Sequence, residues 1–314
     1  MTILVTGGAG FIGSHLVEKL LSENHGVVCI DNFDTFYDPK IKRENISAAS
    51  AHKNFTLIEG DIRDAAVLRE CFGRKKIDVV VHLAARAGVR PSIQQPELYY
   101  DVNVTGTLRV LEAMRASNVK KLVFGSSSSV YGNNPTVPFS ETDPVDHPIS
   151  PYAATKKAGE LLCYSYHHLY EFDIFCLRFF TAYGPRQRPE MAIHKFAKDI
   201  LGGKPVTMYG DGSTQRDYTY VADIVAGILA SAQRVRGYEI INLGESRTIS
   251  LLDLIHTIEK CAGKKATITQ MPEQPGDVKI TYANIEKAVR ILDYHPTTGI
   301  EDGVRKFVEW LRKS

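Results

Sequence analysis

Short apolar runs rich in β-branched residues recur along the first 180 residues, and longer amphipathic stretches separate several of them. The runs lie at residues 3–5, 27–30, 55–58, 79–83, 121–124 and 174–177. Helical periodicity occupies residues 14–24 and 97–117. Alternating strands and helices are typical of parallel sheets, because each parallel connection needs a long crossover. The pattern predicts an α/β fold: a Rossmann-like doubly wound parallel sheet with helices on both faces.

The pattern changes after residue 180. Pro and Gly become frequent, as in AYGPRQRPE, LGGKP and YGDGS, and the elements become shorter. Helical patterns return at residues 221–235 and 250–261, and DGVRKFVEWLRKS predicts a closing amphipathic helix. We expect an N-terminal domain over residues 1–180 and a smaller C-terminal α/β lobe over residues 181–314. The chain should cross between them more than once.

Composition restricts the class of protein. The chain has 314 residues, 44% of them hydrophobic, and a net charge of +2, which gives no support for a nucleic-acid partner. Its five cysteines are scattered without a C-x-x-C pair, so neither a disulfide framework nor a metal site is indicated. The chain starts directly on a strand pattern, and no apolar run is long enough to span a bilayer. We expect a cytoplasmic protein with reduced core thiols, unattached to membranes.

A glycine-rich turn follows the first predicted strand. In VTGGAGFIGSH the glycines Gly7, Gly10 and Gly13 precede and open a predicted helix. Small residues here let the backbone approach a pyrophosphate, which binds at the helix N-terminus. Asp31, at the end of the second strand, would bind the adenosine ribose hydroxyls and repel a 2′-phosphate, which favours NAD over NADP. The alternative is a tight strand-to-helix turn without a ligand.

Two further segments carry candidate site residues. EGDIRD, after the third strand, offers Asp61 and Ile62 on the adenine side, although Asp61 is also explained as an ordinary loop acid. SPYAATKKAGE places Tyr152 and Lys156 four residues apart, on one face of a helix. A free tyrosine has a pKa of ~10. A nearby ammonium and a nicotinamide cation would lower that pKa and make Tyr152 a usable base.

The stretch VFGSSSSVYG has two interpretations: a flexible serine-rich linker, or the mouth of an active site. It follows a predicted strand and precedes the Tyr152 and Lys156 pair by about 25 residues. A linker would not lie between a strand and such a pair, so the active-site interpretation is favoured. His82 lies in an apolar strand and is expected to be a core histidine with its hydrogen bonds satisfied.

These segments together resemble the extended short-chain dehydrogenase/reductases, in the branch of NAD-dependent nucleotide-sugar epimerases and dehydratases. The resemblance covers nearly the whole chain and rests on TGGAGFIG, HLAA, NVTGT, SSSSVYG, YAATK, RFFTAYGPRQRPEM, GDGSTQRDYTYVADI and QPGDV. It implies an enzyme with tightly bound NAD. Tyr152 takes the proton of a sugar hydroxyl while hydride moves to NAD, Lys156 holds the nicotinamide ribose, and the Ser127 hydroxyl relays the proton.

The same resemblance implies a cofactor site and assigns the domain over residues 1–180 to NAD and the lobe over residues 181–314 mainly to the nucleotide sugar. The expected cofactor-binding residues are Gly7, Gly10, Phe11, Ile12, Gly13, Asp31, Asn32, Asp61, Ile62, Leu83, Ala84, Ala85, Asn103, Tyr152 and Lys156.

The residues after Ser127 restrict the reaction. The resembling dehydratases carry Asp-Glu directly after the relay hydroxyl, and the decarboxylases carry Glu two places after it. This chain has Ser128 and Ser129 there, so elimination lacks its catalyst. What remains is oxidation at one carbon, rotation of the ketone and reduction from its other face. The expected reaction is 4-epimerisation of a UDP-sugar through a 4-keto intermediate.

The choice of sugar rests on two segments. RFFTAYGPRQRPEMAI and DNFDTFYDPKIKRENI resemble the UDP-glucuronate 4-epimerases, whereas UDP-galactose 4-epimerases more often have Asn where Thr181 stands. Hydroxyl donors would hold the sugar carboxylate without a fixed positive charge. The expected substrate-binding residues are Ser127, Ser128, Thr181, Arg186, Arg188, Met191, Arg216 and Asp277.

Several alternatives stay open at this point. The chain has Gln274 where many relatives carry Arg, which leaves the number of diphosphate-binding arginines open. UDP-glucose or UDP-N-acetylglucosamine is an alternative substrate, and decarboxylation of UDP-glucuronate is a less favoured reaction. A non-catalytic NAD-binding scaffold would be expected to lose Tyr152 or Lys156. The family also implies a homodimer that packs residues 96–116 and 152–170 into a four-helix interface, although the same apolar residues would suit burial within one chain.

Overall fold

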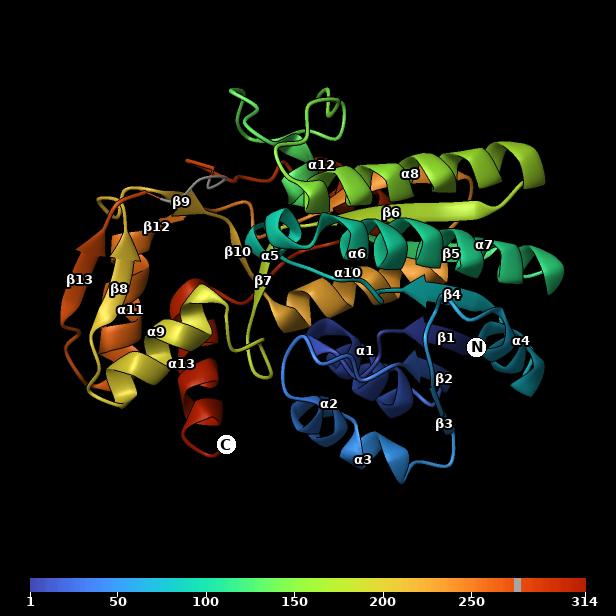
Figure 1. Cartoon of the computed structure of the whole chain (residues 1–314), viewed down its shortest axis with the longest axis horizontal. Helices are drawn as coiled ribbons and strands as arrows, with labels where there is room; N and C mark the ends of the chain where they lie inside the picture. Colours follow the sequence, from blue (N-terminus) through green and yellow to red (C-terminus); the bar gives the residue numbers. More distant parts are fainter. Residues whose placement is uncertain (274–277) are drawn as a thin grey trace.

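The computed structural model describes residues 1–273 and 278–314. Within them, a seven-stranded parallel sheet has the order β11-β6-β5-β4-β1-β2-β3 (Figure 1). The strands are β1 (Thr2–Thr6), β2 (Gly26–Asp31), β3 (Phe55–Glu59), β4 (Val79–His82), β5 (Lys121–Ser127), β6 (Asp173–Phe179) and β11 (Tyr238–Leu243). The first six coincide with the six apolar runs, which confirms the predicted doubly wound sheet.

Alternating side chains of the strands enter two separate cores. Ile3 and Val5 pack on one face of the sheet, whereas Leu4 packs on the other. Helices α1 (Phe11–Ser22) and α10 (Val221–Arg234) cover the first face, and α4 (Ala65–Arg74), α7 (Gly106–Ala116) and α8 (Pro151–Tyr170) cover the second. Because both faces are covered, the strands are apolar on both sides and read as continuous hydrophobic runs.

The order of the sheet fixes where a ligand can bind. The chain winds outward from β1 through β2 to β3, and then returns to place β4 on the other side of β1. The loops after β1 and β4 therefore diverge to opposite faces and leave a crevice at the carboxyl ends of these strands. Crevices of this kind are where ligands bind in open α/β sheets.

The smaller lobe follows β6 and lies on one side of the sheet (Figure 1). Its helices α9, α11 and α13 pack together beside the two-stranded β13-β8 sheet. Its elements are β7 (Thr181–Tyr183), α9 (Ala192–Leu201), β8 (Val206–Tyr209), β9 (Gln215–Arg216), β10 (Tyr218–Tyr220), β12 (Ile249–Ser250), α11 (Leu251–Ala262), β13 (Ile268–Met271) and α13 (Ile300–Leu311).

Residues 221–243 lie with the large sheet although they follow residue 180, since α10 covers it and β11 forms its edge. The chain therefore returns to the large sheet after leaving it. Helix α12 (Glu286–Leu292) returns to the same side and packs on α10 and β11. No helix in the described part of the chain has the length and apolar character needed to cross a membrane.

The single helix expected at residues 97–117 is divided into three parts. They are α6 (Pro96–Tyr100), a π-helical turn η1 (Asp101–Thr105) and α7. Helix α5 (Val89–Gln94) precedes them, α2 (Pro39–Asn45) and α3 (Ser47–Ser50) follow β2, and a 3₁₀ turn η2 (Ser128–Tyr131) follows β5. π-Turns within helices often occur at functional sites. Here the turn directs the Asn103 side chain toward the start of α8, where it meets Thr155.

Candidate functional site

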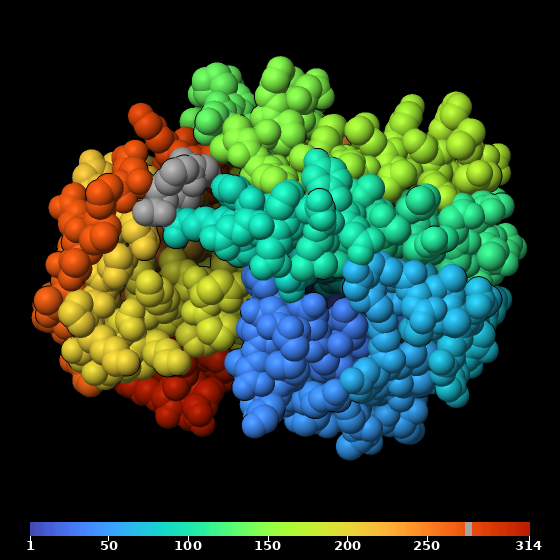
Figure 2. Space-filling model, viewed as in Figure 1, coloured from blue at the N-terminus to red at the C-terminus, as the bar shows by residue number. Residues whose placement is uncertain are grey.

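A cavity of about 460 Å³ lies along the carboxyl ends of the central strands. Its walls come from the turn after β1, the end of β2, the segment after β4 and the end of β5, and residues of the β7–α9 segment close its other side. In Figure 2 the surface is hollowed where the teal segment around α5 faces the yellow part of the smaller lobe. The cavity thus occupies the crevice that the sheet order predicts.

The glycine turn forms the floor of this cavity. Gly7 has a positive φ of 70°, which L-residues with a Cβ rarely adopt. A Cβ on Gly13 would lie 2.2 Å from the Gly7 carbonyl oxygen, so this turn closes only with glycine there. Gly10 caps α1, and the first N–H groups of that helix have no partner within it. The turn therefore offers backbone donors and a helix N-terminus to an anion.

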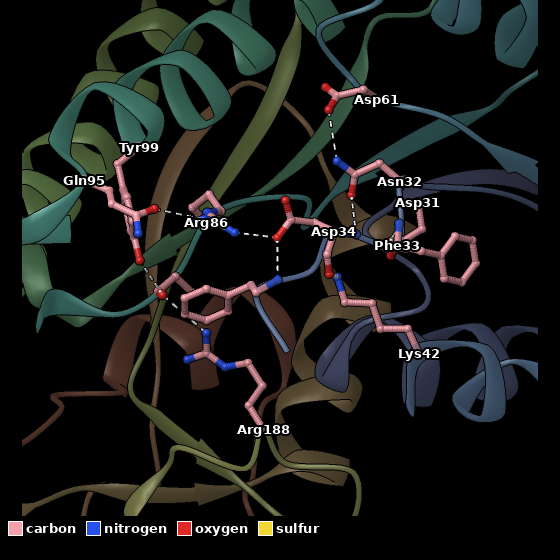
Figure 3. A network of polar contacts seen from close by, with 12 residues as sticks. Asp31, Asn32, Phe33, Asp34, Lys42, Asp61, Arg86, Gln95, Tyr99 and Arg188 are labelled. Carbon is pink, nitrogen blue, oxygen red and sulfur yellow. Dashed lines mark hydrogen bonds and ion pairs between the residues drawn. The ribbon is translucent and has the colours of Figure 1, made fainter. Parts of the chain in front are cut away.

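Acidic and amide side chains line the far end of the cavity, as Figure 3 shows. The two oxygens of Asp31 accept hydrogen bonds from the N–H groups of Ala9 and Phe33, at 3.0 and 2.9 Å. Burial raises the pKa of Asp31, while the nearby Lys42 ammonium lowers it. Each carboxylate oxygen keeps a second acceptor position for a ribose hydroxyl.

Asp61 forms the next part of the same wall. Its carboxylate accepts two hydrogen bonds from the Arg63 side chain, and one from Asn32 at 2.9 Å. These bonds, those from Arg63 first among them, lower the pKa of Asp61 to about 2. Asp61 is thus ionised, and its carboxylate holds the Asn32 side chain in place.

Helix α8 brings the tyrosine and lysine to the opposite end of the cavity. Ser150 caps the helix by accepting a hydrogen bond from the Ala153 N–H, and Pro151 occupies the first helical position. Lys156 donates a 2.7 Å hydrogen bond to the carbonyl of Gly125 in β5. Its ammonium lies 6.0 Å from the centre of the Tyr152 ring. The predicted pair therefore shares one wall of the cavity with the end of β5.

The protonation of this pair follows from its burial. Burial raises the pKa of Tyr152, while hydrogen bonding with Ser127 and the charge of Arg188 lower it. Burial lowers the pKa of Lys156 to about 8, so its ammonium stays mostly protonated at neutral pH. The chain alone does not depress the Tyr152 pKa as expected, because desolvation outweighs its partners. A cation brought in by a ligand would be needed to form the phenolate near pH 7.

The serine stretch is part of this site and not a linker. Ser126 and Ser127 end β5, and the Ser127 hydroxyl caps η2 by accepting a hydrogen bond from the Ser129 N–H. Ser126 donates to Glu160, which also forms a buried ion pair with Arg178 of β6 at 2.9 Å. This buried network fixes the end of β5 against α8. All three residues 127–129 line the cavity.

His82 is a core histidine, as expected. Its ring nitrogens contact the hydroxyls of Thr6 and Thr107, at 2.6 and 3.0 Å. Burial lowers the pKa of His82 to about 3, so the ring is neutral. Four of the five cysteines are buried and free, and Cys261 is partly exposed. No cluster of three or more metal-ligating side chains occurs among the described residues.

Most of the predicted site residues meet in this one cavity. On the substrate side, Ser128, Thr181, Arg188 and Met191 line it together with Ser127. On the cofactor side, every predicted residue except Asn103 lines it. Asn103 is buried behind the wall, where it accepts a hydrogen bond from the Arg86 N–H and donates one to Thr155. Its side chain thus links the segment after β4 to helix α8 behind the cavity wall.

Among the described residues, two substrate-side predictions lie outside the cavity walls. The Arg186 guanidinium forms an ion pair with Glu18 of α1 at 2.6 Å and does not line the cavity, so its contact with the substrate stays a prediction. A positive φ of 65° turns Arg186 toward α1. Arg216 lies on β9, outside the walls of this cavity. Asp277 and Gln274 lie outside the described residues.

Comparison with known proteins agrees with this geometry. The family model described as GDP-mannose 4,6 dehydratase matches residues 4–307. The chain belongs to the extended short-chain dehydrogenase/reductases. The UDP-glucuronate 4-epimerase of Thermodesulfobacterium geofontis is 45% identical, over 99% of this chain and 96% of that protein.

Solved structures of this dehydrogenase/reductase family match the whole fold. UDP-glucuronic acid 4-epimerase from Bacillus cereus, in complex with UDP-glucuronic acid and NAD, has a TM-score of 0.93 and 39% identity. The match covers 100% of this chain and 99% of the other. UDP-glucose 4-epimerase from Thermotoga maritima, with UDP-glucose, has a TM-score of 0.92 and 33% identity over 100% and 99% of the two chains.

The sequence interpretation missed part of the site of this dehydrogenase/reductase. Asp34, Phe36 and Tyr37, from the loop after β2, line the cavity, as does Arg86 after β4. Two sequence signals point to them. The loop carries adjacent aromatic residues in DTFYDP, and Arg86 is the one charged residue in the small-residue run LAARAG.

We predict that Gly13→Ala prevents NAD retention, because the new Cβ would displace the Gly7 carbonyl that closes the turn. The affinity for NAD should fall at least about tenfold, which corresponds to ~1.4 kcal/mol or more of lost binding free energy. Bound NAD, measured by absorbance after denaturing the purified protein, should fall with it. Gly73→Ala is the matched control, since a Cβ there meets nothing within 4 Å. Equal NAD content in the two variants would contradict this role of the turn.

Proposed function

We propose that this protein is an NAD-dependent 4-epimerase of a UDP-sugar, which interconverts UDP-glucuronate and UDP-galacturonate through a 4-keto intermediate. The observation that carries the proposal is the convergence of Ser127, Tyr152 and Lys156 on the same cavity as the glycine turn. Ser128 and Ser129 extend that wall where elimination would need acids.

The cavity residues divide the chemistry among them. The glycine turn, Asp31 and Lys156 would hold NAD, which when bound accepts a hydride from C4 of the sugar and returns it. Tyr152 takes the proton of the C4 hydroxyl as the hydride leaves, and Ser127 relays it. The buried Lys156 ammonium contributes positive charge beside the Tyr152 ring. Rotation of the ketone lets the same hydride return to its opposite face.

Hydroxyl donors on the substrate side favour glucuronate. Ser127, Ser128 and Thr181 line the cavity together, and each hydroxyl would donate a hydrogen bond to a substrate without a fixed charge. The 4-keto form of a glucuronate is a β-keto acid, which readily loses CO₂. Hydrogen-bond donors that hold the carboxylate in an orientation unfavourable for the loss of CO₂ would protect the intermediate. The similarity to the Thermodesulfobacterium and Bacillus enzymes supports the same sugar.

The test is proton NMR of UDP-glucuronate incubated with the purified protein, without added NAD. UDP-galacturonate should appear, and Tyr152→Phe should lower the rate by about 10²–10⁴-fold, as expected for loss of a general base. Tyr170→Phe makes the same change at the far end of α8, where the ring is partly exposed, and should leave the rate unchanged.

Other products would revise the proposal in defined ways. A pentose product with CO₂ would mean decarboxylation and would contradict the role given to Ser128 and Ser129. Turnover of UDP-glucose or UDP-N-acetylglucosamine alone would retain the 4-epimerase and change its sugar. Absence of turnover with all three sugars and added NAD would leave a non-catalytic NAD-binding protein.

We also propose that residues 1–180 serve mainly NAD and residues 181–314 mainly the nucleotide sugar. The cavity supports this division, because its predicted cofactor residues precede residue 180, whereas Thr181, Arg188 and Met191 line its other side. A cytoplasmic location is the accompanying expectation, which the free cysteines support.

A homodimer through the α6–α7 segment and α8 is the last part of the proposal. These helices carry exposed large apolar residues, namely Tyr100, Leu108, Leu161, Tyr164, Leu169 and Tyr170. Exposed apolar residues on these helices favour an interface between protein chains.

We predict that light scattering finds twice the chain mass and that Leu161→Glu shifts the protein to the monomer, because a charge would be buried at the interface. Leu161 is 56% exposed in the single chain. Ile268→Glu, at an exposed position of β13 in the other lobe, is the control and should keep the dimer. A wild-type monomer at micromolar concentration would contradict the proposal.

A further inference from the structure

Four side chains join the walls of the cavity beside the cofactor residues. They are Asp34 and Phe36 in the loop after β2, Arg86 after β4, and Arg188 between β7 and α9. We call this group the strap. All four side chains line the cavity, and none belongs to the Ser127, Tyr152 and Lys156 constellation. Figure 3 shows the side chains of Asp34 and Arg86 pointing toward each other.

Asp34 is the fixed point of the loop. Its N–H donates to the Asn32 side chain at 3.0 Å, and its carboxylate accepts a hydrogen bond from the Phe36 N–H at 2.8 Å. The Asp34 carbonyl accepts another hydrogen bond, from the Lys42 ammonium, at 3.0 Å. The loop that presents the Phe36 ring is therefore ordered by local polar contacts.

Arg86 ties that loop to the segment after β4. Its guanidinium forms an ion pair with Asp34 and donates to Gln95 at 3.2 Å. The side chain is only 12% exposed, which makes a charge-assisted pair stronger than one at the surface. The buried Arg86 Nε has no hydrogen-bond partner within the described protein.

Phe36 lies between two guanidinium groups. Its ring centre is 4.9 Å from the guanidinium carbon of Arg86 and 5.5 Å from the guanidinium carbon of Arg188. Arg188 also donates a 3.3 Å hydrogen bond to the Ala87 carbonyl, which accepts a second from Tyr99 at 2.8 Å. The strap thus connects three chain segments, two from the NAD side and one from the substrate side.

We propose that the strap retains NAD in the cavity, and that the Asp34–Arg86 ion pair must break before NAD can leave. The inference rests on the proposed epimerase function, which needs such retention. The hydride taken from the sugar must return to the same ketone, so loss of the reduced cofactor would strand the intermediate. A dehydrogenase that releases its cofactor each cycle has no such need.

The experiment measures exchange of bound NAD with an excess of radiolabelled NAD⁺ in the purified holoprotein, without any sugar. Arg86→Gln and Asp34→Asn each remove one charge and keep a hydrogen-bonding side chain. Each should raise the exchange rate constant about tenfold or more, as expected for loss of a partly buried charged hydrogen bond. The double variant should exchange no faster than the faster single variant, because both changes break one pair.

Arg74→Gln is the matched control, since it breaks an exposed Arg–Glu pair on α4 away from the cavity. It should exchange at the wild-type rate. Wild-type rates in Arg86→Gln and Asp34→Asn, or an equal increase in Arg74→Gln, would overturn the proposal. If one strap variant fails to fold, the other still decides the question. Because no sugar is present, the exchange result does not depend on which substrate is assigned. An error in the assigned substrate would appear only in the NMR experiment, as missing turnover.

Discussion

The site depends on one buried contact, the hydrogen bond from the Lys156 ammonium to the Gly125 carbonyl. It joins the second turn of α8 to β5 and so fixes where Tyr152 and Ser127 meet. An ammonium buried without such partners would be costly, and its burial already lowers the pKa of Lys156 to about 8. The same side chain therefore holds the helix in place and keeps positive charge beside the tyrosine.

Packing behind this contact makes it possible. Glu160, one turn further along α8, pairs with Arg178 of the neighbouring strand and accepts a hydrogen bond from Ser126. On the other side, Asn103 in the π-turn donates to Thr155. Hydrogen bonds are electrostatically stronger in the low dielectric of a protein interior, so these buried contacts hold their neighbours in place. Polar groups on both sides of α8 thus determine the position of the Tyr152 and Lys156 pair.

The sequence allowed the sheet, the glycine turn and the Tyr152–Lys156 pair to be predicted, because these depend on local patterns. Strand periodicity, glycine spacing and a four-residue helical interval all lie within short segments. What the sequence did not indicate depends on long-range contacts. Arg186 was predicted to bind the substrate, and its ion pair with Glu18, 168 residues away in the chain, could not be inferred from a local motif. The pairing of Asp34 with Arg86 likewise required the fold, since β4 and β2 are separated by β1.

The central claim is that one bound cofactor takes hydrogen from C4 of the sugar and returns it to the same carbon. The most direct test uses UDP-glucuronate that carries deuterium at C4, incubated with the holoprotein in ordinary water. The account predicts UDP-galacturonate with the deuterium still at C4, seen by proton and deuterium NMR. Replacement of the deuterium by solvent hydrogen would contradict it, because the hydrogen would then have left as a proton instead of a retained hydride.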